Sequence, residues 1–294
     1  MPIFVYYNVN RSVLDIPLRI RGSHSFEKAS AFQAFAGNNF RLFFEWFRNQ
    51  EDYENEIRRN DSFFEDIQLK AVRNAIYSFM PGFNNLRVER RPKLNMTIEK
   101  NNKKLIINSL SDGEKCLIAM IGDLARRMAT ANPQMEYPLE GEGIVLIDEV
   151  ELHLHPEWQR KIVPSLCNVF PNIQFFITTH SPQVLGEIKD MDIIKLIKYN
   201  DDAKAQRIIS TFGRDSDFIL EQFMDASEKN TDTSKKINQI YELINIKNFN
   251  EAERIMEDIA GEVGNDDADV VKTRLLIARG KAKNEAGDKG RPAT

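Results

Sequence analysis

Two carboxylates stand at the end of an apolar run near the middle of the chain. The run extends from Gly143 to Ile147, and Asp148 and Glu149 follow it directly. A continuous apolar run of this length is typical of a strand buried in a parallel sheet, and open α/β sheets bind ligands at the carboxyl ends of such strands. There Asp148 could hold Mg²⁺ that bridges phosphates, and Glu149 could orient and deprotonate an attacking water. The simpler alternative is a charged exit from a strand.

A second candidate lies upstream, where the segment Ser111 to Glu114 opens a helix predicted to end near Met128. Ser111 and Glu114 have the serine-x-x-glutamate spacing of a capping box, which closes the first turn of a helix. A helix N-terminus also offers free N–H donors and partial positive charge, and Gly113 would allow a phosphate to approach closely. The segment therefore predicts either a structural cap or a phosphate-binding turn.

The third candidate is His180, which follows a second apolar run from Ile173 to Thr178. An amphipathic helix is predicted from Glu157 to Val169, between the two runs, so the three elements form a βαβ unit with parallel strands. His180 would then lie at the same sheet edge as Asp148 and Glu149, where it could donate a hydrogen bond to a terminal phosphate or to the attacking water. The alternative is a structural or merely exposed histidine.

The same region also fits a different chemistry. His153 and His155 follow the acidic pair and, together with it and His180, make an oxygen and nitrogen ligand set that would suit a metal-dependent hydrolase. On a strand His153 and His155 would share a face, but Pro156 begins a predicted helix and places them in a loop. The metal-dependent hydrolase is therefore the less favoured interpretation.

The elements that position these motifs follow an α/β pattern. Their apolar spacing and turn residues predict, outside the βαβ unit, a strand at Pro2 to Tyr7, a polar loop at Val9 to Ser25, helices at Ala31 to Gln50, Ser62 to Met80 and Asp215 to Met224, and strands at Ile193 to Ile197 and Gln206 to Ser210.

Residues 84–108 alternate in polarity or are β-branched, which predicts an antiparallel meander with a tight turn at Asn101 and Asn102. The meander carries seven basic residues that could contact nucleic-acid phosphates, Arg87, Arg90, Arg91, Lys93, Lys100, Lys103 and Lys104. The alternative is a solvated edge that its charges protect from aggregation. Because the whole chain has 40 Lys and Arg against 44 Asp and Glu, a nucleic-acid contact would have to be local.

Beyond Ala226 the composition changes to a polar linker followed by three helical patterns, at Ile237 to Ile244, Asn250 to Ile259 and Asp267 to Ala282. We expect residues 1–226 to form the α/β domain, 227–285 a helical hairpin similar to a tetratricopeptide pair, and 286–294 to be disordered. The helical tail would either dock an effector nuclease or another partner protein, or cap the first domain.

The composition predicts a soluble globular protein, since 42% of the residues are apolar. Cys116 and Cys167 lie in apolar helical stretches and resemble reduced core residues more than a disulfide or a metal site. The sequence has no basic leader and no run of about 18 apolar residues, so we expect a cytoplasmic protein without membrane contact.

Taken in order, the helix cap, the acidic strand end and the histidine strand end resemble the motifs of ABC-type ATPases. The corresponding elements of that class are the signature motif at Ser111 to Glu114, Walker B with its catalytic glutamate at Asp148 and Glu149, and the switch histidine at His180. The segment Asp148 to Pro156 resembles the heads of the RecF, SMC and OLD branch. Tyr6 to Arg11, the meander and the tail are similar to ATPase subunits of Septu and retron-linked antiphage systems.

This resemblance implies an α/β ABC-type P-loop NTPase head, with the helices of residues 31–80 and the meander inserted, that dimerises head to tail to hydrolyse ATP with Mg²⁺. Such a head would drive a DNA-related or antiphage-defence machine. The resemblance assigns ATP contacts to Ser111, Asp112, Gly113 and Glu114, the metal to Asp148, and catalysis to Glu149 and His180.

The chain departs from this class in two ways. The 294 residues contain no G-x-x-x-x-G-K-[ST], the loop that cradles phosphates, and Asp112 stands where many signature motifs have glycine. We therefore expect an amino-terminal truncation, a split gene product or a late start. A homodimer or split-subunit partner would supply the P-loop, and the chain alone would hydrolyse ATP poorly. The alternative is a non-catalytic binding or assembly module.

Overall fold

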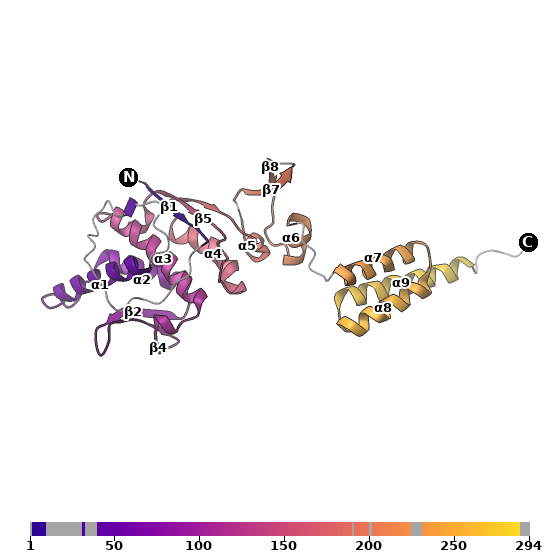
Figure 1. Cartoon of the computed structure of the whole chain (residues 1–294), viewed down its shortest axis with the longest axis horizontal. Coiled ribbons are helices and arrows are strands. Elements are labelled where there is room, and N and C mark those ends of the chain that lie inside the picture. Colours follow the sequence, from indigo (N-terminus) through magenta and orange to yellow (C-terminus); the bar gives the residue numbers. More distant parts are fainter. Residues whose placement is uncertain are drawn as a thin grey trace, which may run out of the picture. The chain divides into compact units, whose positions relative to one another are not determined.

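The computed structural model describes residues 2–9, 31–32, 40–189, 191–199, 202–224 and 231–288, and it divides the chain into two units, Met1–Ile219 and Leu220–Thr294 (Figure 1). The first unit mixes strands and helices, in agreement with the predicted α/β class. The expected polar loop after Tyr7 falls almost entirely outside the described residues, as does most of the terminal segment for which disorder is predicted.

A three-stranded parallel sheet carries the two strand ends singled out from the sequence. Its order is β1 (Ile3–Tyr7), β5 (Gly143–Ile147) and β6 (Ile173–Ile177), and α4 (Pro156–Val169) connects the last two strands. The predicted βαβ unit is thereby confirmed. The register pairs the last residues of all three strands, so the strands end level and the residues after β5 and β6 emerge side by side.

The two faces of this sheet differ. Alternate residues of β1 and β5 are buried in the main core, on the side where α3 (Asp112–Ala131) packs against β1. On the opposite face the residues Phe4, Ile144 and Phe176 are 43%, 37% and 53% exposed. The sequence predicts strands covered on both faces, and for the described residues that prediction is wrong, because they leave these three side chains open.

Helices α1 (Phe40–Ile57) and α2 (Ile67–Phe79) both pack against α3. Their sequence-predicted ranges are 31–50 and 62–80, and part of the first range lies outside the described residues. The second helix begins later than predicted because Asp66 caps it, with its Oδ1 accepting a backbone hydrogen bond from the first turn at 2.7 Å.

The first helix continues past its predicted end because polar residues turn inward. Glu51 and Glu54 interrupt the apolar pattern of α1, yet both are buried, with Arg73 of α2 lying 3.3 Å from a Glu51 oxygen and 2.9 Å from a Glu54 oxygen. An arginine fork pairs well with buried carboxylates, which apolar periodicity alone does not predict. The helix boundary therefore depends on a tertiary ion pair.

The predicted meander is present as β2 (Phe83–Glu89), β3 (Asn95–Lys100) and β4 (Lys103–Ile106), paired antiparallel in that order. Asn101 and Asn102 link the last two strands with φ values of 50° and 61°. Two consecutive left-handed residues are the requirement of a type I′ hairpin turn, and asparagine tolerates that conformation well. The meander and its tight turn are confirmed.

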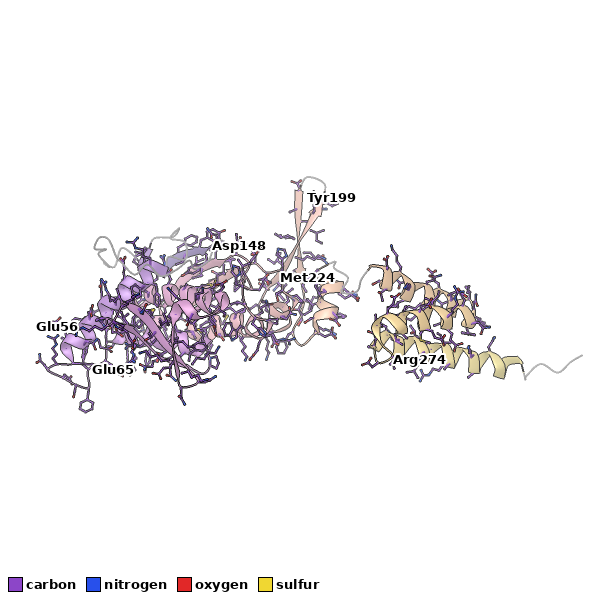
Figure 2. The ribbon with its side chains drawn as sticks, turned by 60° about the horizontal axis from the view of Figure 1, so that its bottom comes forward. Glu56, Glu65, Asp148, Tyr199, Met224 and Arg274 are labelled. Atoms are coloured by element: carbon purple, nitrogen blue, oxygen red, sulfur yellow. The ribbon has the colours of Figure 1, made fainter. Side chains whose placement is uncertain are left out.

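The remaining elements of the first unit lie after the sheet. A short helix α5 (Pro182–Gly186) is followed by the antiparallel hairpin β7 (Ile193–Tyr199) and β8 (Asp202–Ile208), and then by α6 (Ser216–Phe223), which runs across the boundary between the units. The hairpin projects from the body of the unit, and Figure 2 shows Tyr199 at its far end, away from Asp148. Short 3-10 turns also lie at Ile107–Ser109 and Pro138–Glu140.

Besides the end of α6, the second unit contains, in its described residues, the helices α7 (Thr231–Asn245), α8 (Phe249–Val263) and α9 (Ala268–Asp288). Each of these helices contacts the other two, and they share a separate apolar core. The helical character of the tail agrees with its sequence patterns, while a likeness to tetratricopeptide repeats stays a prediction.

Two sequence expectations concern the solvent and the membrane. Cys116 is buried as expected, but Cys167 is exposed, because it lies on the solvent side of α4, so the prediction of a second core cysteine is wrong. Among the described residues, the helices are all too short or too polar to cross a membrane.

A buried cluster of charges fixes α3 against the sheet. The Tyr7 hydroxyl donates to Asp123 Oδ2 at 3.0 Å, and the same carboxylate is 2.6 Å from Arg126 and 2.7 Å from Arg127. Burial favours the neutral acid, but the two guanidinium groups outweigh burial and hold the pKa of Asp123 below its usual range. Burial and the nearby Asp123 raise the pKa of Tyr7 well above its usual value. The cluster thus sets where the N-terminus of α3 lies relative to the strand ends.

Asp123→Asn should lower the free energy of unfolding of the first unit by about 3–5 kcal/mol, because it leaves buried guanidinium groups without their carboxylate. Tyr7→Phe removes one hydrogen bond to that carboxylate and should cost about 1 kcal/mol. Urea unfolding followed by tryptophan fluorescence measures both changes. An Asp123→Asn variant within about 1 kcal/mol of the parent would contradict the role given to this cluster.

Candidate functional site

The level strand ends bring the acidic pair next to the end of β6. The Asp148 N–H donates to the Tyr7 carbonyl at 2.9 Å, which continues the sheet by one residue. Thr178, the residue after β6, uses one hydroxyl twice: it donates to Asp148 Oδ1 and accepts from the Glu149 N–H at 2.8 Å. A single threonine therefore orients the first carboxylate and the backbone of the second.

The backbone of Glu149 is in an unfavourable conformation. Its φ is +47°, in the left-handed region that costs an L-residue other than glycine about 1–2 kcal/mol. The surrounding backbone maintains it, because the Val150 N–H donates to the Thr178 carbonyl at 3.1 Å and the Leu152 N–H donates to the Glu149 carbonyl at 3.0 Å. Strain of this kind concentrates at functional sites, and here it falls on the residue predicted to activate water.

His180 is held at the same edge through its backbone. The Glu151 carboxylate accepts hydrogen bonds from the His180 N–H at 2.5 Å and from the Thr179 hydroxyl at 2.7 Å. The His180 side chain is exposed. The structure thus brings the acidic pair and the histidine to one edge of the sheet, as the sequence predicts, while their catalytic roles stay predictions.

The segment Ser111 to Glu114 forms a complete capping box at the start of α3. The Glu114 N–H donates to Ser111 Oγ at 3.3 Å, and the Ser111 N–H donates to Glu114 Oε2 at 2.9 Å. The other Glu114 oxygen lies 2.6 Å from Lys100 Nζ of the meander. Desolvation alone would raise the pKa of Glu114, but the bonds from Lys100 and Ser111 together lower it. The structural interpretation of this motif is confirmed, and phosphate binding stays a prediction.

The capping box lies beside the loop that follows the acidic pair. A side chain at Gly113 would bring its Cβ within 2.3 Å of the His153 carbonyl, so the glycine is required by close packing of two backbones. His153 itself has φ +65°, and His155 caps α4 by accepting the Glu157 N–H at 3.3 Å. An open pocket lies here, lined by Lys100, Ser111, Gly113, Glu114, His153, Leu154, His155, Glu157 and Trp158.

Asp112 points to solvent at the same turn. Its side chain is 85% exposed and pairs with Lys115 at 2.8 Å. The hydrogen bond from Lys115 lowers the pKa of Asp112. This acidic residue therefore presents its charge outward from the signature-like turn, partly balanced by the neighbouring lysine.

Gly113→Ala should destabilise the first unit by about 1–3 kcal/mol, since the new methyl group would overlap the His153 carbonyl. Gly261 of α8 provides a matched control, because a Cβ there meets nothing within 4 Å. Gly261→Ala should leave the second unit unchanged or stabilise it by up to about 1 kcal/mol. Thermal unfolding of both variants measures these changes. Equal changes in stability for the two variants would contradict the close approach of Gly113 to the His153 carbonyl.

The described residues contain no group of three or more His, Cys, Asp or Glu side chains placed to hold a metal ion. His155 is moreover engaged in capping α4. The metal-dependent hydrolase with a His and Asp ligand set is therefore not supported. Mg²⁺ has different needs, since it is bound through one or two carboxylates and keeps waters or phosphate oxygens as its other ligands. The Asp148 carboxylate fits that pattern, and the Thr178 hydroxyl beside it fixes its orientation.

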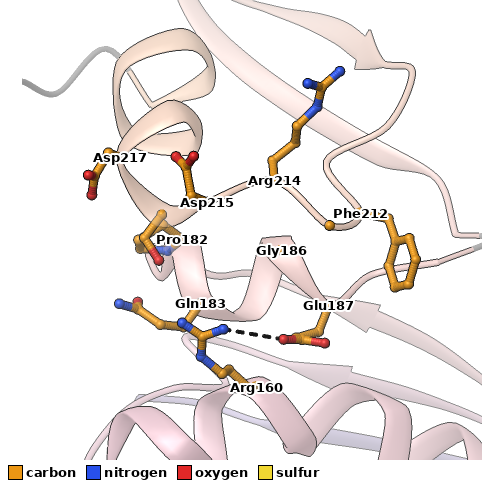
Figure 3. Close-up of a pocket in the computed structure, with 11 residues that line it drawn as sticks. Arg160, Pro182, Gln183, Gly186, Glu187, Phe212, Arg214, Asp215 and Asp217 are labelled. Carbon is orange, nitrogen blue, oxygen red and sulfur yellow. Dashed lines mark hydrogen bonds and ion pairs between the residues drawn. The ribbon is translucent and has the colours of Figure 1, made fainter. Parts of the chain in front are cut away.

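A second pocket lies between α4, α5 and the turn before α6 (Figure 3). Arg160 forms a long ion pair with Glu187 at 3.5 Å, and Arg214 lies 4.9 Å from the centre of the Phe218 ring. Asp215 and Asp217 supply the opposite charge across the pocket. The sequence assigned no function to this region, and its mixture of charges selects no particular ligand.

Sequence reasoning missed the residues that connect the motifs. In the sequence Thr178 only ends an apolar run, and no pattern gives Thr179 or Glu151 a role. A signal for them exists, since hydroxyl and carboxylate side chains within two residues of two level strand ends can reach one another. These hydrogen bonds can be predicted only when the two strands are known to be neighbours that end level with each other.

With this geometry established, the chain is assigned to a class by comparison with known proteins. It belongs to the family described as "AAA domain, putative AbiEii toxin, Type IV TA system", whose model matches residues 13–186, more than half of its length. The match includes the signature-like turn, the acidic pair and His180. This match confirms the predicted membership in the class of ABC-type ATPases.

Particular relatives narrow the comparison. "Retron Ec83 probable ATPase" of Escherichia coli is 31% identical over 344 residues, covering 95% of this chain and 62% of the relative. "Retron Vc95 probable ATPase" of Vibrio cholerae serotype O1 biovar El Tor is 36% identical, covering 65% of this chain and 46% of the relative. "Septu protein PtuA" of Bacillus mycoides (strain KBAB4) is 33% identical over 50% of this chain and 21% of that protein. The chain thus spans about half to two thirds of the two retron relatives.

Among solved structures, the chain is similar to one described under "Structural biochemistry of ATP-driven dimerization and DNA stimulated activation of SMC ATPases". The sequence identity is 18% and the TM-score 0.41, over 60% of this chain and 99% of that one.

Proposed function

We propose that this chain is part of an ATP-hydrolysing head of the ABC type, acting in an antiphage-defence or DNA-related machine. The observation that carries the proposal is that Asp148, Glu149 and His180 lie together where the parallel strands end. Hydrogen bonds from Thr178 and to Glu151 hold them there. The chain also belongs to a family of ATPase domains. Phosphoryl transfer requires little covalent chemistry from a protein. It requires groups held in place around the phosphate and the attacking water.

Each residue has a distinct part in this proposal. Asp148 would hold Mg²⁺, which neutralises charge on the phosphate oxygens when it is bound. Glu149 would accept the proton of the attacking water, and His180 would donate a hydrogen bond to the terminal phosphate. Ser111, Gly113 and the first free N–H groups of α3 would contact the nucleotide bound by a second copy, with Asp112 at the rim of that contact. The active site would thereby be shared between two chains.

The phosphate cradle would come from outside these 294 residues, either from preceding sequence or from a partner chain. Two features of the sheet favour such an addition. Within the described residues β6 pairs only with β5, so its other edge is open for a strand. The apolar side chains of Phe4, Ile144 and Phe176 on the open face would be buried by an added layer, which stabilises at roughly 25 cal/mol per Å². The sheet would thus accept a P-loop lobe at its edge and across this face.

Phosphate release from ATP tests the proposal directly. The chain alone should release little phosphate, because the developing charge lacks a lysine and amide cradle. The chain extended through in-frame upstream codons, or mixed with a neighbouring gene product that carries G-x-x-x-x-G-K-[ST], should hydrolyse ATP. Glu149→Gln should then lower kcat by at least about 100-fold.

Glu140→Gln is the matched control, since Glu140 is an exposed carboxylate in the 3-10 turn before β5 and its substitution should leave turnover unchanged. Rapid turnover by the chain alone that Glu149→Gln abolishes would refute the need for a separate cradle. Absence of turnover with a P-loop present would refute the ATPase proposal and favour a binding or assembly module.

Contact with DNA through the meander is a narrower part of the proposal. Four of its seven basic residues are already in ion pairs, Arg87 and Lys104 with Glu89, Arg90 with Glu51 and Asp52, and Lys100 with Glu114. Arg91, Lys93 and Lys103 are exposed, and the ion pairs of the described residues do not include them. Any phosphate contact would therefore depend on these three.

Replacing Arg91, Lys93 and Lys103 together with glutamate should weaken binding to a DNA duplex. The slope of its salt dependence should fall by about 0.9 for each DNA phosphate that the variant no longer neutralises. Fluorescence anisotropy at several salt concentrations measures both quantities. Arg279→Glu on α9 makes the same kind of charge change on the other unit and should have no effect. Equal binding by all variants would exclude the meander as the contact.

The remaining parts of the proposal concern the whole assembly. The Septu and retron relatives suggest that the complete protein acts with a defence partner, and α7, α8 and α9 are the surface proposed for an effector nuclease or another protein. The cytoplasm is the compartment proposed for such a machine.

A further inference from the structure

We infer that Glu151 is a positioning residue that sets the place of His180 relative to Asp148 and Glu149, an inference that rests on the function proposed above. Glu151 neither belongs to the acidic pair nor lies at a strand end. Its importance comes from two hydrogen bonds that cross from the loop after β5 to the turn after β6.

The bonds of Glu151 hold both sides of one turn. One carboxylate oxygen accepts the His180 N–H at 2.5 Å, and the other accepts the Thr179 hydroxyl at 2.7 Å. The Thr179 hydroxyl oxygen also accepts the Ser181 N–H at 3.0 Å. A carboxylate has two acceptor oxygens and no donor, so it can satisfy both of the donors that face it without a competing proton.

Neighbouring bonds fix the turn from its two ends. Before it, Thr178 is bonded to Asp148 and to the Glu149 backbone. After it, Ser181 donates to the Gln159 side chain at 2.7 Å, and Gln159 donates to the Leu154 carbonyl at 2.8 Å. Both ends of the turn are therefore joined to the loop that carries the acidic pair. Glu151 makes the hydrogen bonds between these two ends, including the one to His180 itself.

This arrangement gives Glu151 a role that backbone pairing cannot replace. The turn after β6 leaves the sheet, so no neighbouring strand of the described residues accepts the His180 N–H, and the carboxylate takes that place. Without it the turn would stay anchored at Thr178 and Ser181, while the histidine between them would lose its fixed position. The distance from His180 to the phosphate and water held by the acidic pair would then vary.

Glu151→Gln tests the inference, because glutamine keeps the shape but has no negative charge and only one acceptor oxygen, so the charge-assisted hydrogen bond from the His180 N–H is weakened. In residue-resolved amide hydrogen exchange, the His180 N–H should exchange at least tenfold faster in Glu151→Gln. Amides of the sheet should be unchanged. Thr179→Val, which removes the second donor, should produce a smaller acceleration at the same amide. Glu140→Gln is the matched control and should change nothing.

Unchanged exchange at His180 in Glu151→Gln overturns the inference. So does uniform acceleration across the first unit in both Glu151→Gln and Thr179→Val, since that pattern shows a general structural role. With the P-loop-bearing protein described above, Glu151→Gln should lower kcat about tenfold and leave the KM for ATP within twofold. If that protein has no turnover that Glu149→Gln abolishes, the proposed function fails while the exchange measurement still decides the role of Glu151.

Discussion

The level ending of three parallel strands is the constraint on which the rest of this structure depends. Because Ile147 lies in register with Tyr7 and Ile177, the two residues after β5 and the residues after β6 leave the sheet at one edge although about thirty positions separate them in sequence. A shift of one residue in either pairing would turn the strand ends to the opposite face of the sheet. The buried Asp123 cluster then places α3 on the same framework, so the capping box inherits its position from the sheet.

The loop from Glu149 to His155 performs two tasks that oppose each other. At its start it must present a carboxylate at the sheet edge, and near its end it must pass close enough to Gly113 that only a hydrogen atom fits between them. A chain that turns twice within so few residues needs left-handed backbone, and it has it at Glu149 and His153. The conformational cost is offset by bonds to Thr178 and by the cap that His155 forms on α4.

The sequence was sufficient for features that depend on local spacing, and insufficient for features that depend on long-range contacts. Periodicity and turn chemistry predicted the βαβ unit, the Asn101-Asn102 hairpin and the Ser111-Glu114 cap, because each is determined by residues a few positions apart. The end of α1 was missed since Arg73 pairs with Glu51 and Glu54 only in the folded chain. For the same reason the hydrogen bonds made by Thr178 and Glu151 could not be predicted. The open face of the sheet was missed because apolar strand residues do not reveal what covers them.

The open sheet face and the free edge of β6 also favour self-association of the chain. Exposed aromatic side chains such as Phe4 and Phe176, next to backbone N–H and C=O groups that no described strand pairs, form a surface on which another chain can add as a strand. The edge of β6 is thus more prone to pair with another chain than the edge of the meander, where lysines and arginines discourage such pairing. Self-association through this surface would compete with a specific partner, and its extent would rise with protein concentration.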